Sequence, residues 1–138
     1  MRTVMKPEQL AAGRCHPLTV THAYTDAQAD DQLGVLPGWH REVRAISRTY
    51  RFKGWLETLA FVNAVGWMSH SQDHHPDLAV HFNHCTVRWH THSVDGLSEN
   101  DFVCAARTDA LASDLASDQS SDQTSDLAND QPSDRTAG

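Results

Sequence analysis

Hydrophobic and polar residues alternate along this chain with two different periods, and the change of period marks the expected elements. From residue 46 to 52 and again from 78 to 92, apolar side chains stand at every second position, which is typical of strands with one buried face. Between residues 55 and 70 they recur every three or four positions, which predicts one amphipathic helix. The apolar positions of that helix are Trp55, Leu59, Val62, Val65 and Met68.

Turn and capping residues set the boundaries of the first elements. Thr25 and Gln28 fit a capping box, which predicts a short helix that runs to about Val35. Pro37 and the following glycine break that helix. A first strand is then expected over residues 39–45, and a second over residues 46–52. Arg48 falls on the apolar side of the second strand, so we expect it to be partly buried and paired.

A similar signal opens the last helix. Ser98 is the expected cap, Asp101 stands at the third helical position, and the helix should end near Leu111. Between this helix and the amphipathic one, two strands with a turn near Asn83 form a hairpin. The order of elements therefore predicts an α+β fold, a four-stranded antiparallel sheet with helices packed on one face (α-β-β-α-β-β-α).

Composition divides the chain of 138 residues into one small domain and two tails. Residues 1–24 show no clear period and are read as a loose N-terminal arm, and the domain itself spans 25–111. From residue 112 a tetrapeptide repeats an Asp at every fourth position, and we expect residues 112–138 to be a disordered, acidic Ser-Asp tail.

Charge and cysteine content exclude several classes of function. The tail holds six Asp and one Arg, or −5 of the net −7, which leaves −2 for residues 1–111. The domain therefore offers no basic surface for nucleic acid, and no apolar run is long enough to span a membrane. Three cysteines without C-x-x-C spacing argue for reduced thiols, and, with no signal peptide recognised, for a cytoplasmic location.

Candidate chemistry is concentrated between residues 74 and 101. His74 and His75 precede Pro76, which cannot continue a helix, so this pair should lie at a helix-to-strand junction. A Thr91-His92 pair closes the hairpin, and Asp101 follows just inside the last helix. Imidazoles titrate near neutral pH and can donate or accept a proton, so such a group is suited to acid–base work.

These motifs, in this order, resemble those of the pterin-4a-carbinolamine dehydratases. The resemblance covers roughly residues 20–111 and includes the Leu36-Pro37-Gly38-Trp39 and Ser47–Phe52 stretches. It implies a hydro-lyase that removes water from a 4a-hydroxytetrahydropterin to give a quinonoid dihydropterin, in pterin recycling. It also implies a homodimer or homotetramer, a possible functional link to an aromatic amino acid hydroxylase, and no metal or other cofactor.

The resemblance also implies roles for individual residues. His74 and His92 would be the acid–base pair, and His75 would bind or orient the pterin. Asp101 would hold one imidazole in a productive tautomer, as carboxylates often do. Backbone beside Pro76, with Thr91 and His92, would complete the binding site.

Two positions depart from the family's pattern. His70 stands where the family often has an acidic residue, four positions before His74. A carboxylate there would raise the basicity of His74, whereas a charged imidazole would lower it, so we treat His70 as a possible modulator. Leu78-Ala79 replace a usual bulky aromatic, so the wall of the pocket is expected to differ.

Two other functions stay open at this point. One is metal binding, because His70 and His74 are spaced i, i+4 and could be joined by His75 and His92. The other is a non-catalytic dimerisation or protein-interaction role, because a small sheet has free edges that can pair. In both cases Asp101 would be only the acid of a capping box.

Overall fold

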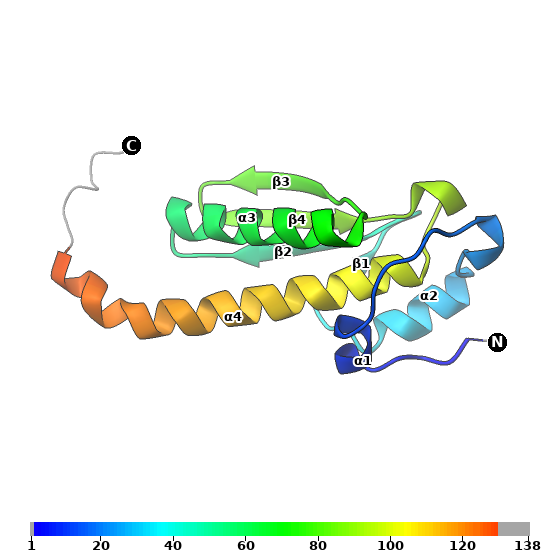
Figure 1. The fold of residues 1–138 in the computed structure, drawn as a ribbon, viewed down its shortest axis with the longest axis horizontal. Helices are drawn as coiled ribbons and strands as arrows, with labels where there is room; N and C mark the ends of the chain where they lie inside the picture. Colours follow the sequence, from blue (N-terminus) through cyan, green and yellow to red (C-terminus); the bar gives the residue numbers. More distant parts are fainter. Residues whose placement is uncertain (1, 130–138) are drawn as a thin grey trace.

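The computed structural model describes residues 2–129, without the side chains of Val20 and residues 117–129. The chain folds into an α+β architecture, as predicted, with three additional short helical segments among the described residues (Figure 1). In order the elements are α1 (Pro7–Ala11), the 3-10 turn η1 (Val20–His22), α2 (Asp26–Leu33), β1 (His40–Arg41), β2 (Ile46–Arg51), α3 (Trp55–Gln72), β3 (Asp77–His81), β4 (His84–Trp89), the 3-10 turn η2 (His92–Val94) and α4 (Glu99–Asn129).

Four antiparallel strands form one open sheet in the order β1-β2-β4-β3. The two central strands, β2 and β4, point Ile46, Cys85 and Val87 into the core, where each is fully buried. Their other face is polar, and there the hydroxyls of Thr49 and Thr86 lie 2.7 Å apart across the strand pair. The alternation in the sequence therefore places α3 and α4, which pack on each other, against one face of the sheet (Figure 1).

The buried face of α3 differs from the predicted stripe. Val65 and Met68 are buried as expected, but Trp55 is 45% exposed, and Phe61, which was not part of the stripe, is fully buried. Phe61 packs against the ring of Tyr50 on β2, with ring centroids 4.7 Å apart. The periodicity identified the helix correctly but only part of its buried face, because apolar side chains occur all around the helix.

Strand β1 is shorter than the predicted strand over residues 39–45. The chain turns after Arg41, because the backbone N–H of Glu42 bonds to the carbonyl of Ala45 at 2.8 Å. The helix before it is also shorter, since α2 ends at Leu33 rather than near Val35. Its start is confirmed, with both hydrogen bonds of the capping box between Thr25 and Gln28 present.

Arg48 is partly buried and paired, as predicted, and the structure supplies its partner. Its guanidinium donates to Asp109 on α4 at 2.9 Å and to the carbonyl of Pro37 at 3.1 Å. Asp109 also accepts hydrogen bonds from the Tyr50 hydroxyl and the Trp39 indole. This cluster joins α4 to the sheet.

The last helix is longer than predicted. The sequence predicted an end near Leu111 and disorder from residue 112, but α4 continues to Asn129. Leu111, Ala112 and Leu115 are partly buried against the core, so the apolar side of the helix extends into the start of the repeat. The predicted disorder of residues 130–138 lies outside the described residues.

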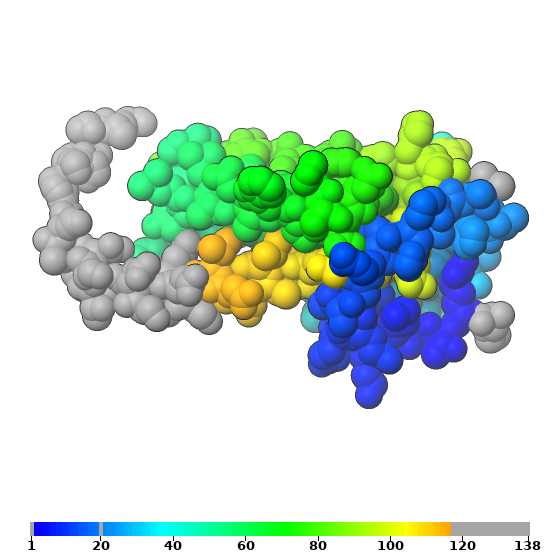
Figure 2. All heavy atoms as spheres, in the orientation of Figure 1, coloured from blue at the N-terminus to red at the C-terminus, as the bar shows by residue number. Residues whose placement is uncertain are grey.

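The N-terminal arm is not loose. Leu10 on α1 is fully buried, and α1 packs against α4. The side-chain amide of Gln32, on α2, bonds to both the N–H and the carbonyl of Met5. Figure 2 shows the arm, in blue, lying against the start of α4 in yellow and the end of α3 in green. The arm therefore covers the junction of these two helices.

Candidate active site

Three chain segments converge where α3 ends, β4 ends and α4 begins. Asp73 caps α3 in the left-handed conformation, with φ of 52°, and the backbone N–H of His74 bonds back to the carbonyl of Ser69 at 3.2 Å. Pro76 then directs the chain into β3, since it cannot continue the helix. The His74-His75 pair therefore leaves the helix at this junction, as the sequence predicted.

Asp101 lies at the centre of the junction, and its side chain is fully buried. One carboxylate oxygen, Oδ1, lies 2.7 Å from Nε2 of His74. The other, Oδ2, accepts from the Thr91 hydroxyl at 2.7 Å and from the backbone N–H of Ser98 at 3.0 Å. Asp101 therefore has two roles: Oδ2 serves the capping box of α4, and Oδ1 binds the imidazole of His74.

His74 is held on two sides. Its side chain is only 11% exposed, and its ring stacks on Trp89, with centroids 5.5 Å apart and planes 8° from parallel. Burial alone would lower the pKa of His74, but the hydrogen bond and the charge of Asp101 outweigh it, so the pKa is raised above its ordinary value. A carboxylate only accepts, so Nε2 carries a hydrogen and Nδ1 is the nitrogen that remains for a ligand.

The other predicted site residues fall into two groups. Thr91 is buried and bonds to Asp101 and to the Ser98 hydroxyl, so it belongs to the same network. His75 and His92 are exposed, one residue beyond His74 and Thr91, and their rings have no hydrogen bond to the residues that the structure describes. The structure thus brings His74, Thr91 and Asp101 together. The imidazoles of His75 and His92 stay accessible next to them in the chain, and Pro76 is half-buried between α3 and β3.

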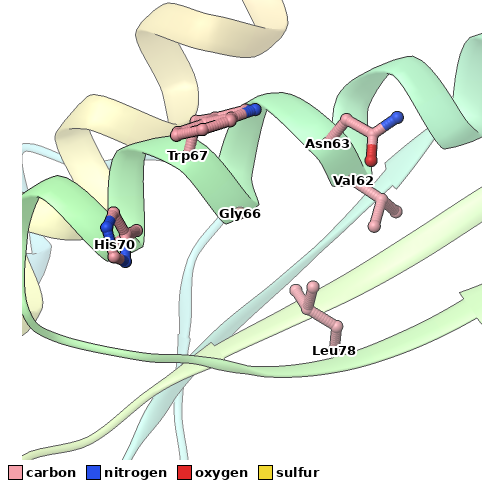
Figure 3. Close-up of a pocket in the computed structure, with 6 residues that line it drawn as sticks. All are labelled: Val62, Asn63, Gly66, Trp67, His70 and Leu78. Atoms are coloured by element: carbon pink, nitrogen blue, oxygen red, sulfur yellow. The ribbon is translucent and has the colours of Figure 1, made fainter.

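His70 lies elsewhere. It lines a groove of about 460 Å³ between α3 and the edge strand β3, next to Trp67 and Leu78 (Figure 3). Its ring meets that of Trp67 edge-on at 6.2 Å. None of the four predicted catalytic residues lines this groove, so the groove is separate from the Asp101 network.

Some residues of the network were not singled out by sequence reasoning. Trp89 is an apolar residue of the strands predicted within residues 78–92, but no pattern in the sequence indicates that its ring stacks on that of His74. Cys15 was assigned only to the arm, yet its backbone N–H bonds to the Gln72 side chain at 2.9 Å, two residues before His74. A hollow of about 320 Å³ near Asn100 is also lined by the arm, through His16 and Pro17. A pattern of periodicity carries no signal for contacts between such distant segments.

Comparison with known proteins identifies the family. The family model described as Pterin 4 alpha carbinolamine dehydratase matches residues 22–111. This chain belongs to the pterin 4-alpha-carbinolamine dehydratase family. The match includes every predicted site residue, the whole of α3 and the start of α4, but it excludes the first 21 residues and the repeat.

Relatives of the pterin dehydratase family cover most of this chain. A protein named for the family from Stenotrophomonas maltophilia (strain K279a) is 49% identical over 109 residues, which is 77% of this chain and 94% of the relative. Another, from Bdellovibrio bacteriovorus, is 42% identical over 113 residues, which is 79% of this chain and 92% of the relative. A crystal structure of a transcriptional coactivator/pterin dehydratase from Brucella melitensis is 29% identical, with a TM-score of 0.62, and covers 65% of this chain and 98% of that one.

Two features weighed from the sequence can be examined in the part of the chain that the structure describes. Among the side chains that the structure describes, in residues 2–19 and 21–116, no three His, Cys, Asp or Glu are grouped closely enough to hold a metal ion. The proposed set of His70, His74, His75 and His92 is therefore not assembled as a ligand cluster there. No helix in the same residues has the length and apolar character needed to cross a membrane.

Proposed function

We propose that this chain removes water from a 4a-hydroxytetrahydropterin and releases a quinonoid dihydropterin. The observation that carries the proposal is the contact of 2.7 Å between His74 and a fully buried Asp101, at a junction flanked by two exposed imidazoles. Family membership supports the same reaction. The reaction needs one proton delivered to the leaving hydroxyl and one removed from a ring nitrogen, and histidines can do both near neutral pH.

His74 is the proposed general acid. Its raised pKa keeps a larger fraction of the ring protonated near neutral pH than an ordinary histidine would have. In that state Nε2 donates to Asp101 and Nδ1 carries the second hydrogen, which can pass to the departing hydroxyl. Asp101 positions the ring and stabilises its positive charge, as the carboxylate does in other His-based sites.

His92 is the proposed general base, and His75 the group that orients the pterin. Both side chains are exposed, so they can contact a ligand that the nearly buried His74 meets through only one ring nitrogen. The backbone beside Pro76 is the proposed polar contact of the neutral pterin ring. Thr91 is buried with its hydroxyl bonded to Asp101 and Ser98, so its proposed role is to support the site through Asp101. For His70 we propose only that it modulates the basicity of His74.

The test is the ultraviolet decay of enzymatically generated 4a-hydroxytetrahydropterin with and without the protein. We expect the protein to accelerate the decay well above the spontaneous rate. His74→Ala and His92→Ala should each lower turnover roughly 10²–10⁴-fold, the usual contribution of one positioned acid or base. His75→Ala should instead raise KM more than it lowers kcat.

His81→Ala is the matched control, because this imidazole is exposed on the β3–β4 hairpin and outside the proposed site. Its turnover should equal that of the wild-type protein. If folded His74→Ala and His92→Ala both keep the wild-type rate, the catalytic assignment is wrong. If the wild-type protein itself leaves the decay unchanged, the proposed reaction is wrong, and the interaction role becomes the better reading.

The place of this reaction follows from its substrate. A 4a-hydroxytetrahydropterin is formed when a tetrahydropterin is oxygenated at the 4a carbon, so a pterin-dependent hydroxylase must supply it. We therefore propose a functional link to an aromatic amino acid hydroxylase, in the recycling of the pterin. Accelerated turnover of such a hydroxylase in a coupled assay would support this link.

We also propose that the chain acts as a homodimer or homotetramer. Leu56 and Trp67 on α3 are 77% and 75% exposed, and they stand three helical turns apart on one side of the helix. Large exposed apolar side chains of this kind often mark an association surface. Light scattering should give a dimer or tetramer for the wild-type protein and a smaller species for Leu56→Ser/Trp67→Ser. A monomeric wild-type protein at micromolar concentration would contradict the proposal.

A further inference from the structure

The N-terminal arm and α4 bring two cysteines together at a place that the proposed chemistry does not use. The Sγ atoms of Cys15 and Cys104 lie 3.4 Å apart, although 89 residues separate them in sequence. Cys104 is fully buried, and Cys15 is half-buried on the arm. A disulfide needs about 2.05 Å between sulfurs, so a movement of little more than 1 Å would close the bond.

We propose that Cys15 and Cys104 form an oxidisable dithiol, a modification site that converts to a disulfide and ties the arm to α4 beside the His74–Asp101 pair. The first family residue matched is His22, so Cys15 lies outside the segment that defines the family. The proposal concerns the thiols themselves and does not depend on the proposed dehydratase activity.

The environment of the two sulfurs makes their reactivity unequal. A hydrogen bond from the Cys104 thiol, opposed in part by burial, lowers the pKa of Cys15, and the charges of His74 and Arg107 lower it further. The same contact and burial raise the pKa of Cys104. Cys15 therefore loses its proton more readily and is the more accessible nucleophile, while Cys104 is the protected partner.

The oxidant we name is hydrogen peroxide, and the step balances with it. The Cys15 thiolate attacks one peroxide oxygen, the O–O bond breaks, and the sulfur becomes a sulfenic acid as hydroxide leaves. Cys104 then attacks that sulfur, the S–O bond breaks, and a second hydroxide leaves. The proton of Cys104 and one from solvent convert the two hydroxides to water, so the dithiol loses two electrons and peroxide gains them.

The second step needs no entry of reagent into the core. Cys104 is inaccessible to peroxide, but its sulfur already lies in contact with the sulfur that becomes the sulfenic acid. This contact favours a disulfide over further oxidation of Cys15. Cys85, the third cysteine, is buried on β4, and burial raises its pKa to about 11, so it should stay a thiol.

The arm around Cys15 touches both helices that carry the candidate site. The Cys15 N–H bonds to Gln72 at the end of α3, and the Asn100 side chain bonds to both the N–H and the carbonyl of His16. Gln72 is two residues from His74, and Asn100 is next to Asp101. A disulfide would therefore fix the chain that joins these two helix ends.

Oxidation of Cys15 and Cys104 should also change the electrostatic environment of the His74 ring. The charged groups that raise its pKa are Asp101 on α4, the Cys15 thiolate on the arm and Asp73 on its own segment. A disulfide removes the charge of Cys15 and leaves the two carboxylates. The titration midpoint of the His74 ring should therefore move to lower pH in the oxidised protein, which an NMR titration can follow.

The experiment uses the full-length chain, first reduced and then treated with a small excess of hydrogen peroxide. We expect a mass loss of about 2 Da, one remaining reactive thiol in denaturant, and a peptide that joins Cys15 to Cys104, all reversed by dithiothreitol. Closing a loop of this length should also raise the thermal midpoint by on the order of 10 °C.

Two variants make the outcome decisive. Cys85→Ser should still lose 2 Da, because this cysteine takes no part. Cys15→Ser, on the arm, should gain no disulfide and keep its two remaining thiols. The proposal is overturned if the oxidised wild-type protein keeps three thiols, if the linked peptide contains Cys85, if the bond joins two chains, or if Cys15 proceeds to the sulfinic acid.

Discussion

Two carboxylates on α4, Asp101 and Asp109, make similar contacts and differ in what they can do. Both accept hydrogen bonds from at least three groups on other segments of the chain, and those of Asp109 include two residues of strand β2. Asp101 is fully buried among His74, Thr91 and Ser98. Asp109 is 27% exposed among Trp39, Arg48 and Tyr50.

The difference lies in the partners. The partners of Asp109 include a guanidinium and an indole, and neither kind of group takes part in proton exchange in proteins. Burial, together with the charge of Asp109, raises the pKa of Tyr50, so this hydroxyl keeps its proton as well. The hydrogen-bond partners of Asp109 therefore offer no group that exchanges a proton near neutral pH, which suits a structural tie. Asp101 instead binds an imidazole that can lose and regain a proton, next to exposed His75 and His92.

The comparison predicts that Asp109→Ala should destabilise the protein without changing the catalytic activity of the folded molecules. It leaves Arg48, Tyr50 and Trp39 without their common acceptor, which should cost about 1–3 kcal/mol in the free energy of unfolding. A domain of this size would then lose on the order of 4–8 °C of thermal midpoint per kcal/mol. Differential scanning calorimetry would measure the loss, and turnover per folded molecule should stay unchanged.

Asp114→Ala is the matched control, because Asp114 is exposed on the same helix. Its thermal midpoint should stay close to that of the wild-type protein. Equal midpoints for Asp109→Ala and Asp114→Ala would mean that the Asp109 cluster does not tie the helix to the sheet.

A smaller effect is expected from Thr91→Val, which keeps the side-chain shape and removes the hydroxyl that donates to Asp101. The lost hydrogen bond should lower stability by about 1 kcal/mol and, by loosening Asp101, reduce turnover about tenfold. Thr86→Val removes a hydroxyl from the polar face of the sheet and should leave turnover unchanged. Similar turnover for the two variants would show that Thr91 does not position Asp101.

The pH dependence of stability should separate the two carboxylates further. The pKa of His74 is raised in the folded state, so its contribution is fully present below the unfolded pKa of about 6.5 and is lost as pH rises through the folded pKa. Urea unfolding from pH 6 to 9 should therefore show a decline for the wild-type protein that His74→Gln lacks. The prediction is contradicted if the stability advantage of the wild-type protein over His74→Gln, measured as the free energy of unfolding, increases as the pH rises.

The smallest effect should come from truncation after Ala116. Leu111, Ala112 and Leu115 are partly buried and stay in the shortened chain, whereas the removed part consists of acidic repeats whose like charges at every fourth position repel in a helix. The thermal midpoint and turnover should change little. A fall of more than about 4 °C would mean that the repeat stabilises the domain.

Local patterns in the sequence predicted most of the fold. The capping boxes at Thr25 and Ser98, the period of α3 and the alternation in β2 and β4 depend on near neighbours, and each element is present. The burial and pairing of Arg48 were also predicted, but not its partner, because Asp109 is 61 residues away. Contacts over such distances are set by packing, which one sequence does not encode in any local pattern.

The candidate site divides in the same way. Its residue types and their order were visible in the sequence, and the resemblance assigned Asp101 to an imidazole without saying which one. The structure selects His74, because the end of α3 lies next to the start of α4. The stacking of Trp89 and the contact of Cys15 with Cys104 had no sequence signal, since each joins segments with unrelated periods.

The most direct test of this account compares Asp101→Asn with Asp109→Asn in the dehydration of 4a-hydroxytetrahydropterin, at equal concentrations of folded protein. Asn can still accept from Thr91 and Ser98, but it carries no charge to hold the His74 imidazolium. We predict that Asp101→Asn loses roughly 10²-fold or more in turnover, whereas Asp109→Asn keeps the wild-type rate and loses stability instead. Equal rates for the two folded variants would contradict the account.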